Sequence, residues 1–286
     1  MDLFLQTLIS GIMTGGIYAI IALGLTLIFG VMRIINLAHG EFLMLGMYGS
    51  YFMFTFLGID PFASLFITTP AVFLLGIILY RYFVSKATDG ENSLILTAGI
   101  SLVIANAAML LWSPDYRHLK VSYGTEVLQL GSVSVSYPML ISFIITIAVT
   151  MALYWFLNKT DLGLAVRASA QQPEAATVVG INVKRIAMFT FGLGAAFASI
   201  SGSLLSPVLY AYPTIGTLFV VKAFVIVVLG GMGSVEGALI GGIILGITES
   251  LGSVYISTGM TDAFGLILFL LVLLFKPSGL FGITAR

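Results

Sequence analysis

Long apolar stretches alternate with short polar breaks along almost the whole chain. An apolar stretch of about 20 residues is long enough to cross a bilayer as a helix. The pattern predicts eight or nine such spans, over residues 3–30, 41–58, 62–83, 93–112, 138–158, 186–209, 217–232, 236–254 and 262–275. The count is left open because the two stretches around residues 229–237 are either full spans or one broken helix with a re-entrant turn. We therefore expect an all-α, polytopic bundle that forms one membrane domain over residues 1–286.

Two breaks are longer than the others. Residues 113–137, rich in Ser, Val, Tyr and Gly, are expected to form a loop that contains a short hairpin. Residues 159–185 are expected to contain two short helices, over 161–170 and 173–179. The second begins at Pro173, which suits the first helical position, and stops before Gly180, the usual helix-ending residue. A helix of about two turns is unstable alone, so it should be docked on something.

Composition places this bundle in a bilayer. Hydrophobic residues make up 59% of the 286 residues and charged residues only 8%, with a mean hydropathy of +1.11. A soluble domain carries roughly 25% charged residues. The net charge is zero, so the chain offers no broad basic face for nucleic acid. The first basic residue is Arg33, so the first stretch is interpreted as a permanent span rather than a cleavable signal peptide.

Lysine and arginine predict the orientation of the chain, because cytoplasmic loops of membrane proteins are enriched in them. The opposite loops hold only Arg117 and Lys120, offset by two acidic residues. With nine spans the N-terminus lies outside and the C-terminus inside. The basic residues of the inner loops and tail are Arg33, Arg81, Lys86, Lys159, Arg167, Lys184, Arg185, Lys276 and Arg286.

Small residues recur at every fourth position in several stretches, a spacing that lets membrane helices approach closely. Gly11, Gly15 and Ala19 form one such row, and Gly194, Ala198 and Gly202 form another. The glycine-rich segment 229–237 is interpreted as a helix break, of a kind that transporters use near a solute site. The residues assigned to the break and to helix packing are Gly230, Gly231, Gly233, Gly237 and Gly241.

Some polar residues lie beside or inside apolar stretches. Asn36, His39 and Glu41 form either an ordinary cytoplasmic turn with helix caps or a group that lines a pathway. A charged group at mid-bilayer costs about 2.5–3.5 kcal/mol, so it would face protein or water. Lys222 and Glu249 lie deeper, and they either pair across helices or extend separately to the membrane surface.

Motifs for chemistry are missing from the sequence. It contains no Gly-Lys-Ser/Thr nucleotide loop, no Gly-x-Ser-x-Gly elbow and no potassium-channel filter. Cysteine is absent, and the only histidines are His39 and His118, far apart in the chain. We expect a protein that is not an enzyme and that holds neither a cofactor nor a metal.

Four segments carry a resemblance. The run Glu174-Ala175-Ala176-x-x-x-Gly180 resembles the coupling motif of ATP-binding-cassette (ABC) importer permeases. Residues 16–19 together with 36–42, the segment 229–237 and the segment 276–282 are similar to those of the branched-chain amino-acid permease family. The likeness extends over essentially the whole chain. The hydrophobic-Leu-Pro ending of the broader coupling motif does not follow Gly180.

The resemblance implies a pore formed with a second homologous permease subunit, in a bacterial or archaeal plasma (inner) membrane. Two cytoplasmic P-loop ATPases would bind ATP and magnesium, and an extracytoplasmic binding protein would deliver the solute. Branched-chain amino acids are the implied solutes, with urea, short amides or aromatic acids as the alternative within the family. An autonomous ion-coupled transporter or channel, using Glu41, Lys222 or Glu249 as the coupling group, remains the rival hypothesis.

The resemblance also implies residue roles. The residues assigned to ATPase coupling are Glu174, Ala175, Ala176, Gly180 and Arg167. The residues assigned to the substrate pathway are Thr14, Tyr18, Asn36, His39, Glu41 and Met44.

Overall fold

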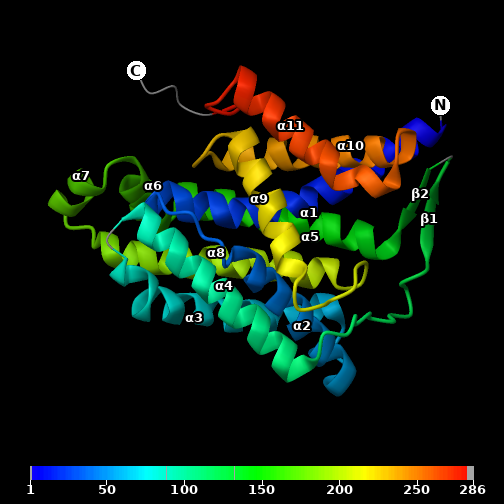
Figure 1. Cartoon of the computed structure of the whole chain (residues 1–286), viewed down its shortest axis with the longest axis horizontal. Helices are drawn as coiled ribbons and strands as arrows, with labels where there is room; N and C mark the ends of the chain where they lie inside the picture. The colour runs from blue at the N-terminus through cyan, green and yellow to red at the C-terminus, as the bar shows by residue number, and fades with distance from the viewer. Residues whose placement is uncertain (1, 88, 132, 282–286) are drawn as a thin grey trace.

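A computed structural model describes residues 2–87, 89–131 and 133–281, and these form a bundle of long helices with one small hairpin (Figure 1). The longest helix, α1, has 31 residues, or about 46 Å at 1.5 Å per residue, which exceeds the roughly 30 Å of bilayer hydrocarbon. The helices are α1 (Asp2–Met32), α2 (His39–Leu57), α3 (Pro61–Tyr82), α4 (Gly90–Trp112), α5 (Tyr137–Lys159), α6 (Asp161–Gln171), α7 (Pro173–Val178), α8 (Val183–Leu205), α9 (Ile215–Gly230), α10 (Val235–Tyr255) and α11 (Thr261–Phe275). The strands are β1 (Val127–Leu130) and β2 (Val133–Ser136), and short 3-10 turns cover Val84–Lys86 and Thr258–Met260.

Each predicted span corresponds to a helix in the described part of the chain, and the all-α fold is confirmed. Seven helices are long and apolar enough to cross a membrane, so the protein is a multi-pass membrane protein. Of the nine predicted spans, the two that are not among these seven helices are α2 and the 16-residue α9. The segment at 229–237 is a turn between two separate helices, α9 and α10, rather than a break within one.

Helix α1 lies at the centre of the bundle, and glycine lets α10 pack directly on it. A Cβ atom on Gly15 would lie 2.5 Å from the Gly242 carbonyl oxygen, and one on Gly11 would lie 2.8 Å from the Ile247 Cα atom. On the other helix, a Cβ atom on Gly246 would lie 2.4 Å from the Gly11 carbonyl oxygen. The backbones therefore touch along this crossing, as the small-residue spacing predicts.

After α1 the chain turns back into the bundle rather than staying at its surface. Arg33 has a positive φ of 53°, which is uncommon for a side chain larger than glycine, and the next residues are irregular. Helix α2 then begins at His39, a residue that is already fully buried. Figure 1 shows this segment running from the end of α1 towards the middle of the bundle. The first turn of α2 crosses the first turn of α9, where a Cβ atom on Gly40 would lie only 1.9 Å from the Gly216 carbonyl oxygen.

The hairpin and the N-terminus lie at one end of the bundle, and α6 and α7 lie at the other (Figure 1). Strands β1 and β2 pair antiparallel, with Leu128 opposite Val135, so the predicted hairpin is confirmed. The Gln6 side chain fastens α1 to it, because its amide donates to the Ser134 carbonyl at 2.6 Å and its oxygen accepts from the Ser134 N–H at 2.7 Å.

The loop before the hairpin is also tied down. Tyr123 donates from its hydroxyl to the Asp60 carboxylate at 2.6 Å, at the N-terminus of α3. Burial, together with the hydrogen bond to Asp60 and its charge, raises the pKa of Tyr123 well above the ordinary tyrosine value, so the hydroxyl stays a donor.

The glycine-rich turn between α9 and α10 is held by the C-terminal segment. Gly231 and Gly233 have positive φ values of 104° and 86°, which glycine adopts readily. The N–H groups of Leu280 and Phe281 donate to the carbonyls of Leu229 and Gly230 at 2.8 and 2.9 Å. Because the last carbonyls of a helix lack a partner within the helix, this segment caps α9.

Candidate functional site: the exposed α6–α7 surface and a buried charge cluster

Helices α6 and α7 form a compact unit at one end of the bundle. Thr160 caps α6 by accepting from the Gly163 N–H at 3.0 Å. A Cβ atom on Gly163 would lie 2.1 Å from the Phe156 carbonyl oxygen, so glycine lets α6 fold tightly against the end of α5. The predicted helices over 161–170 and 173–179 are confirmed as Asp161–Gln171 and Pro173–Val178, and Gly180 follows at φ 89°.

The outer surface of this unit carries four exposed large apolar side chains among charged and polar ones. Val178 is 87% exposed and Val179 is 75% exposed, and Leu162 and Leu164 on α6 are also exposed. Glu174 lies in the first turn of α7 and is exposed, as is Ala175. A group of exposed large apolar side chains rimmed by polar residues is typical of a contact site for a protein.

Two of the residues assigned to ATPase coupling, Ala176 and Arg167, contact the rest of the bundle. Ala176 is only 3% exposed, so it supports α7 from the bundle side instead of presenting itself to a partner. Ala176 therefore packs against the bundle, whereas Val178 and Val179 are the exposed apolar residues of this segment. Arg167 is exposed on α6 and donates to the Asn158 side chain at 3.1 Å, which ties α6 to α5. Sequence reasoning missed Val178 and Val179 because apolar residues in this chain are usually buried or in lipid.

The polar residues of the α1–α2 connection form a turn, as one of the two interpretations expects, but this turn is buried inside the bundle. Asn36 accepts from the Ala38 N–H at 3.1 Å, and His39 contacts the Ile21 carbonyl through Nε2 at 2.9 Å. Glu41 accepts from the Ser101 hydroxyl of α4 at 3.0 Å. These contacts satisfy one polar atom of each side chain, but Asn36 Nδ2, His39 Nδ1 and Glu41 Oε2 are buried without a hydrogen-bond partner among the described residues.

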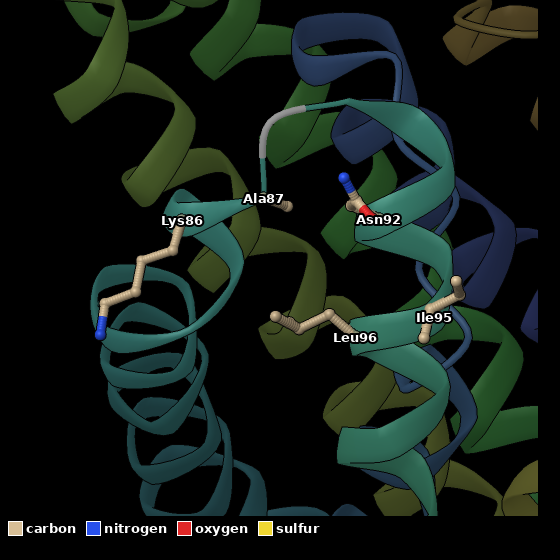
Figure 2. A pocket seen from close by; sticks show the side chains of 5 residues that line it. All are labelled: Lys86, Ala87, Asn92, Ile95 and Leu96. Carbon is tan, nitrogen blue, oxygen red and sulfur yellow. The ribbon is translucent and has the colours of Figure 1, made fainter.

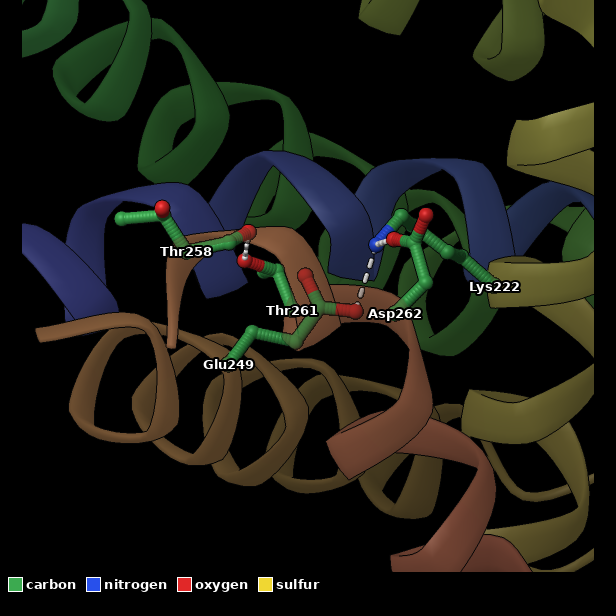
Figure 3. A network of polar contacts seen from close by, with 5 residues as sticks. All are labelled: Lys222, Glu249, Thr258, Thr261 and Asp262. Carbon is green, nitrogen blue, oxygen red and sulfur yellow. Dashed lines mark hydrogen bonds and ion pairs between the residues drawn. The ribbon is translucent and has the colours of Figure 1, made fainter. Parts of the chain in front are cut away.

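A group of three charged side chains, two of them buried, joins three helices (Figure 3). The Lys222 ammonium of α9 donates to the Glu249 carboxylate of α10 at 2.5 Å and to the Asp262 carboxylate of α11 at 2.7 Å. Its charge also lies 5.2 Å from the ring centroid of Tyr18 on α1. The predicted pairing of Lys222 with Glu249 is confirmed, and the alternative that the two residues extend separately to the membrane surface is wrong.

Asp262 is the member of this cluster that the sequence did not single out. It stands at the edge of the last apolar stretch, where a carboxylate resembles an ordinary interface residue. The three side chains form one cluster with one more carboxylate than ammonium. We call Lys222, Glu249 and Asp262 the charge cluster.

Two cavities meet at the charge cluster. The larger, of about 490 Å³, lies between α9, α10 and α11, and is lined by Tyr212, Thr214, Thr217, Leu218, Val221, Lys222, Val225, Leu245, Glu249, Asp262, Gly265 and Leu266. The smaller, of about 320 Å³, lies beside the N-terminal half of α1 and is rich in hydroxyl groups. Its lining residues are Leu3, Gln6, Thr7, Ser10, Thr14, Tyr18, Glu249, Ser250, Ser253, Val254 and Thr261.

The structure divides the predicted pathway residues into two sets. Thr14 and Tyr18 line the smaller cavity together with Glu249. The other four residues belong to the α1–α2 connection and to α2, and they line neither of the two cavities at the charge cluster. These four are Asn36, His39, Glu41 and Met44, and all are buried.

A further recess, of about 360 Å³, lies between the end of α3 and the start of α4 (Figure 2). In Figure 2 the Lys86 ammonium points away from the Leu96 and Ile95 side chains, so the one charged residue among those that line the recess does not point into it. A fourth cavity, of about 540 Å³, lies beside the glycine-rich turn and includes Met232, Gly233 and Ser234.

The arrangement of helices is similar to that of a solved structure. PsaBC from Streptococcus pneumoniae in complex with Fab matches over 97% of this chain and 94% of that chain, with a TM-score of 0.55. The sequences are 13% identical, so this likeness concerns the arrangement of helices alone.

Sequence comparisons define the family. A family model described as branched-chain amino acid transport system, permease component, matches residues 7–275, and the chain belongs to that family. The high-affinity branched-chain amino acid transport system permease protein BraD of Pseudomonas aeruginosa is 34% identical, over 98% of this chain and 96% of that protein. LivH of Escherichia coli is 34% identical over the same shares, and a probable LivH of Methanocaldococcus jannaschii is 29% identical over 95% and 90%.

Proposed function

We propose that this chain is the membrane-spanning subunit of an ABC importer for branched-chain amino acids or related small solutes. The observation that carries the proposal is the exposed α6–α7 surface, on a chain of this permease family that encodes no nucleotide-binding motif. Energy must then come from another protein that contacts this surface. The importer lies in a bacterial or archaeal inner membrane and includes a second permease subunit and an extracytoplasmic binding protein.

Two P-loop ATPases bind ATP and magnesium beneath the pore, and this chain supplies only the contact. Closure of the ATPases pushes α7, which is joined through α6 to α5 and directly to α8. Tilting of α5 and α8 then changes the side on which the pathway is open.

The exposed apolar side chains are sufficient to drive this conformational change when a partner covers them. Moving a two-state gate from 1:99 to 99:1 needs about 5.5 kcal/mol of differential interaction. Covering one exposed valine or leucine completely contributes roughly 1.5–3 kcal/mol. Because these side chains are 51–87% exposed, covering all of Val178, Val179, Leu162 and Leu164 together contributes about 4–8 kcal/mol, a range that includes the required value. The Glu174 carboxylate at the start of α7 stabilises that helix by about 0.3–1 kcal/mol through the helix dipole, in both states of the gate.

The test compares two valine-to-glutamate variants of the tagged chain, purified in mild detergent from its native host. Val178→Glu places a charge on the proposed contact, and Val127→Glu places one on the exposed hairpin at the opposite end. We expect a P-loop ATPase to copurify with the wild type and with the Val127→Glu variant, and to be lost with the Val178→Glu variant. Equal recovery of the ATPase with both variants would contradict the assigned contact.

A further inference from the structure

We infer that α4 carries a helix-pairing face, through which this chain binds a membrane helix of the second permease subunit. This surface deepens the proposed function, since it rests on the second permease subunit included there and identifies where that subunit binds. Three features of α4 carry the assignment, namely its exposure, the heptad spacing of its exposed residues, and an asparagine inside the apolar layer of the membrane.

Helix α4 is attached to its own bundle along one side. Of its 23 residues only Ser93, Thr97 and Ala108 are buried. Thr97 joins it to the α1–α2 connection by donating to the Ile35 carbonyl at 3.2 Å. The opposite side of the helix is exposed along its whole length.

The exposed side has the spacing of a paired helix. Positions seven residues apart, with a second set three positions further on, form the seam between two helices that wind around each other. All six residues of α4 at this spacing are exposed, and we call them the heptad face: Asn92, Ile95, Gly99, Leu102, Asn106 and Met109. A Cβ atom on Gly99, near the middle of this face, would meet no neighbouring atom within 4 Å, so another helix can approach closely there.

Asn106 indicates that a protein rather than lipid covers the heptad face. Helix α4 is about 34 Å long at 1.5 Å per residue, and Asn106 lies about 9 Å before its end at Trp112, inside the roughly 30 Å of hydrocarbon. The Asn106 amide nitrogen donates to the Leu102 carbonyl of the same helix at 2.7 Å, and its side-chain oxygen accepts no hydrogen bond from the described residues. Lipid tails offer that oxygen no donor, whereas asparagine side chains form hydrogen bonds between membrane helices.

The same asparagine indicates the kind of partner. An amide side chain is both a donor and an acceptor, so two amides that face each other across a two-fold axis satisfy one another. A polar residue at one position of a heptad seam also fixes the register of the two helices. The partner is therefore a membrane subunit of the same fold and orientation, with a polar residue opposite Asn106.

The inner end of the heptad face has room for such a partner. Asn92 and Ile95 line the recess of about 360 Å³ between the end of α3 and the start of α4 (Figure 2). Side chains of a paired helix insert as knobs between the residues of the facing helix. The recess can therefore receive a side chain of the second subunit.

The experiment is photo-cross-linking of the tagged full chain in membranes of its native host, with p-benzoylphenylalanine in place of single residues. Leu102 of the heptad face is 66% exposed, and the control, Leu74 on α3, is 56% exposed. We expect ultraviolet light to join the chain at position 102 to a protein that mass spectrometry identifies as a permease of the same family, either a homologue or a second copy. The control at position 74 should give no such product.

Variants test the two residues that carry the assignment. Asn106→Leu should lower recovery of the second subunit with the tagged chain about threefold or more, the change produced by a hydrogen bond of average strength between membrane helices, and Asn106→Gln should retain most of it. Gly99→Leu should lower recovery at least as far, because its side chain blocks close approach. Ala152→Leu, which adds the same bulk to an exposed position of α5, should leave recovery unchanged.

Three results would overturn the assignment: equal cross-linking at positions 102 and 74, no protein product at position 102, or full recovery of the second subunit with both Gly99→Leu and Asn106→Leu. None of these measurements involves the ATPase. Cross-linking to a second permease without any copurifying ATPase would contradict the proposed importer and leave the heptad face standing, whereas copurification of the ATPase without cross-linking at position 102 would do the reverse.

Discussion

Removing Lys222 from the charge cluster should destabilise the bundle strongly, and removing Glu249 with it should restore much of the loss. Lys222→Met leaves the Glu249 carboxylate buried without the ammonium that lies 2.5 Å from it. Breaking a buried ion pair by deleting one partner costs about 3–5 kcal/mol, whereas replacing both partners by apolar residues is often close to neutral.

The same variants separate Glu249 from Asp262. The side chain of Glu249 is 6% exposed and that of Asp262 is 61% exposed, so water already screens the second ion pair. An exposed pair contributes about 0–1 kcal/mol, and Asp262→Asn should therefore change stability by no more than that. The coupling energy between Lys222 and Glu249 should reach about 2 kcal/mol or more, while that between Lys222 and Asp262 stays below about 1 kcal/mol.

The measurement is the free energy of unfolding from denaturant titration in detergent micelles, for the wild type, the single variants Lys222→Met, Glu249→Leu and Asp262→Asn, and the two double variants containing Lys222→Met. Tryptophan fluorescence reports loss of packing, since the ring of Trp112 lies 4.5 Å from that of Tyr48, while the second tryptophan, Trp155, is exposed in the folded state. The reasoning is refuted if Lys222→Met costs less than about 1 kcal/mol, or if both carboxylates show the same coupling to Lys222.

Two further predictions concern close contacts. Gly40→Ala should destabilise the bundle by about 1–3 kcal/mol or more, because its Cβ would lie only 1.9 Å from the Gly216 carbonyl oxygen. The control variant Gly99→Ala, on the open surface of α4, should have little effect. Equal unfolding midpoints for the two variants would contradict this prediction. Tyr123→Phe should lose the hydrogen bond to Asp60, at a cost of about 1 kcal/mol, and raise the rate of limited proteolysis within residues 113–137; an unchanged cleavage rate would show that this bond does not fasten the loop.

Most of the fold follows from hydrophobic pattern, because a bilayer requires each span to satisfy its own backbone. The same pattern, with Pro173 and Gly180 as helix signals, predicts α7 to within one residue at its end. Residues 113–137 were assigned a hairpin from their composition, and β1 and β2 form it.

The connection between α1 and α2 could not be predicted, because local sequence does not distinguish an exposed polar turn from a buried one. The same residues, Asn36, His39 and Glu41, would occur in an exposed turn and in a buried one. Only their packing against other helices shows that this turn is buried. Asp262 and Val178 were missed for a related reason. Neither residue stands out from its neighbours in the sequence. Asp262 is notable because Lys222 of another helix lies beside it, and Val178 because no other part of the chain covers it.

Reconstituted transport is the most direct test that this chain is an importer subunit. Proteoliposomes would contain the chain either alone or with the permease and ATPase subunits that copurify with it, with the binding protein outside and labelled leucine as the solute. We predict uptake only with the full set of subunits and only with ATP inside. Uptake by the chain alone, driven by an ion gradient and insensitive to ATP, would contradict the proposal and favour an autonomous ion-coupled transporter.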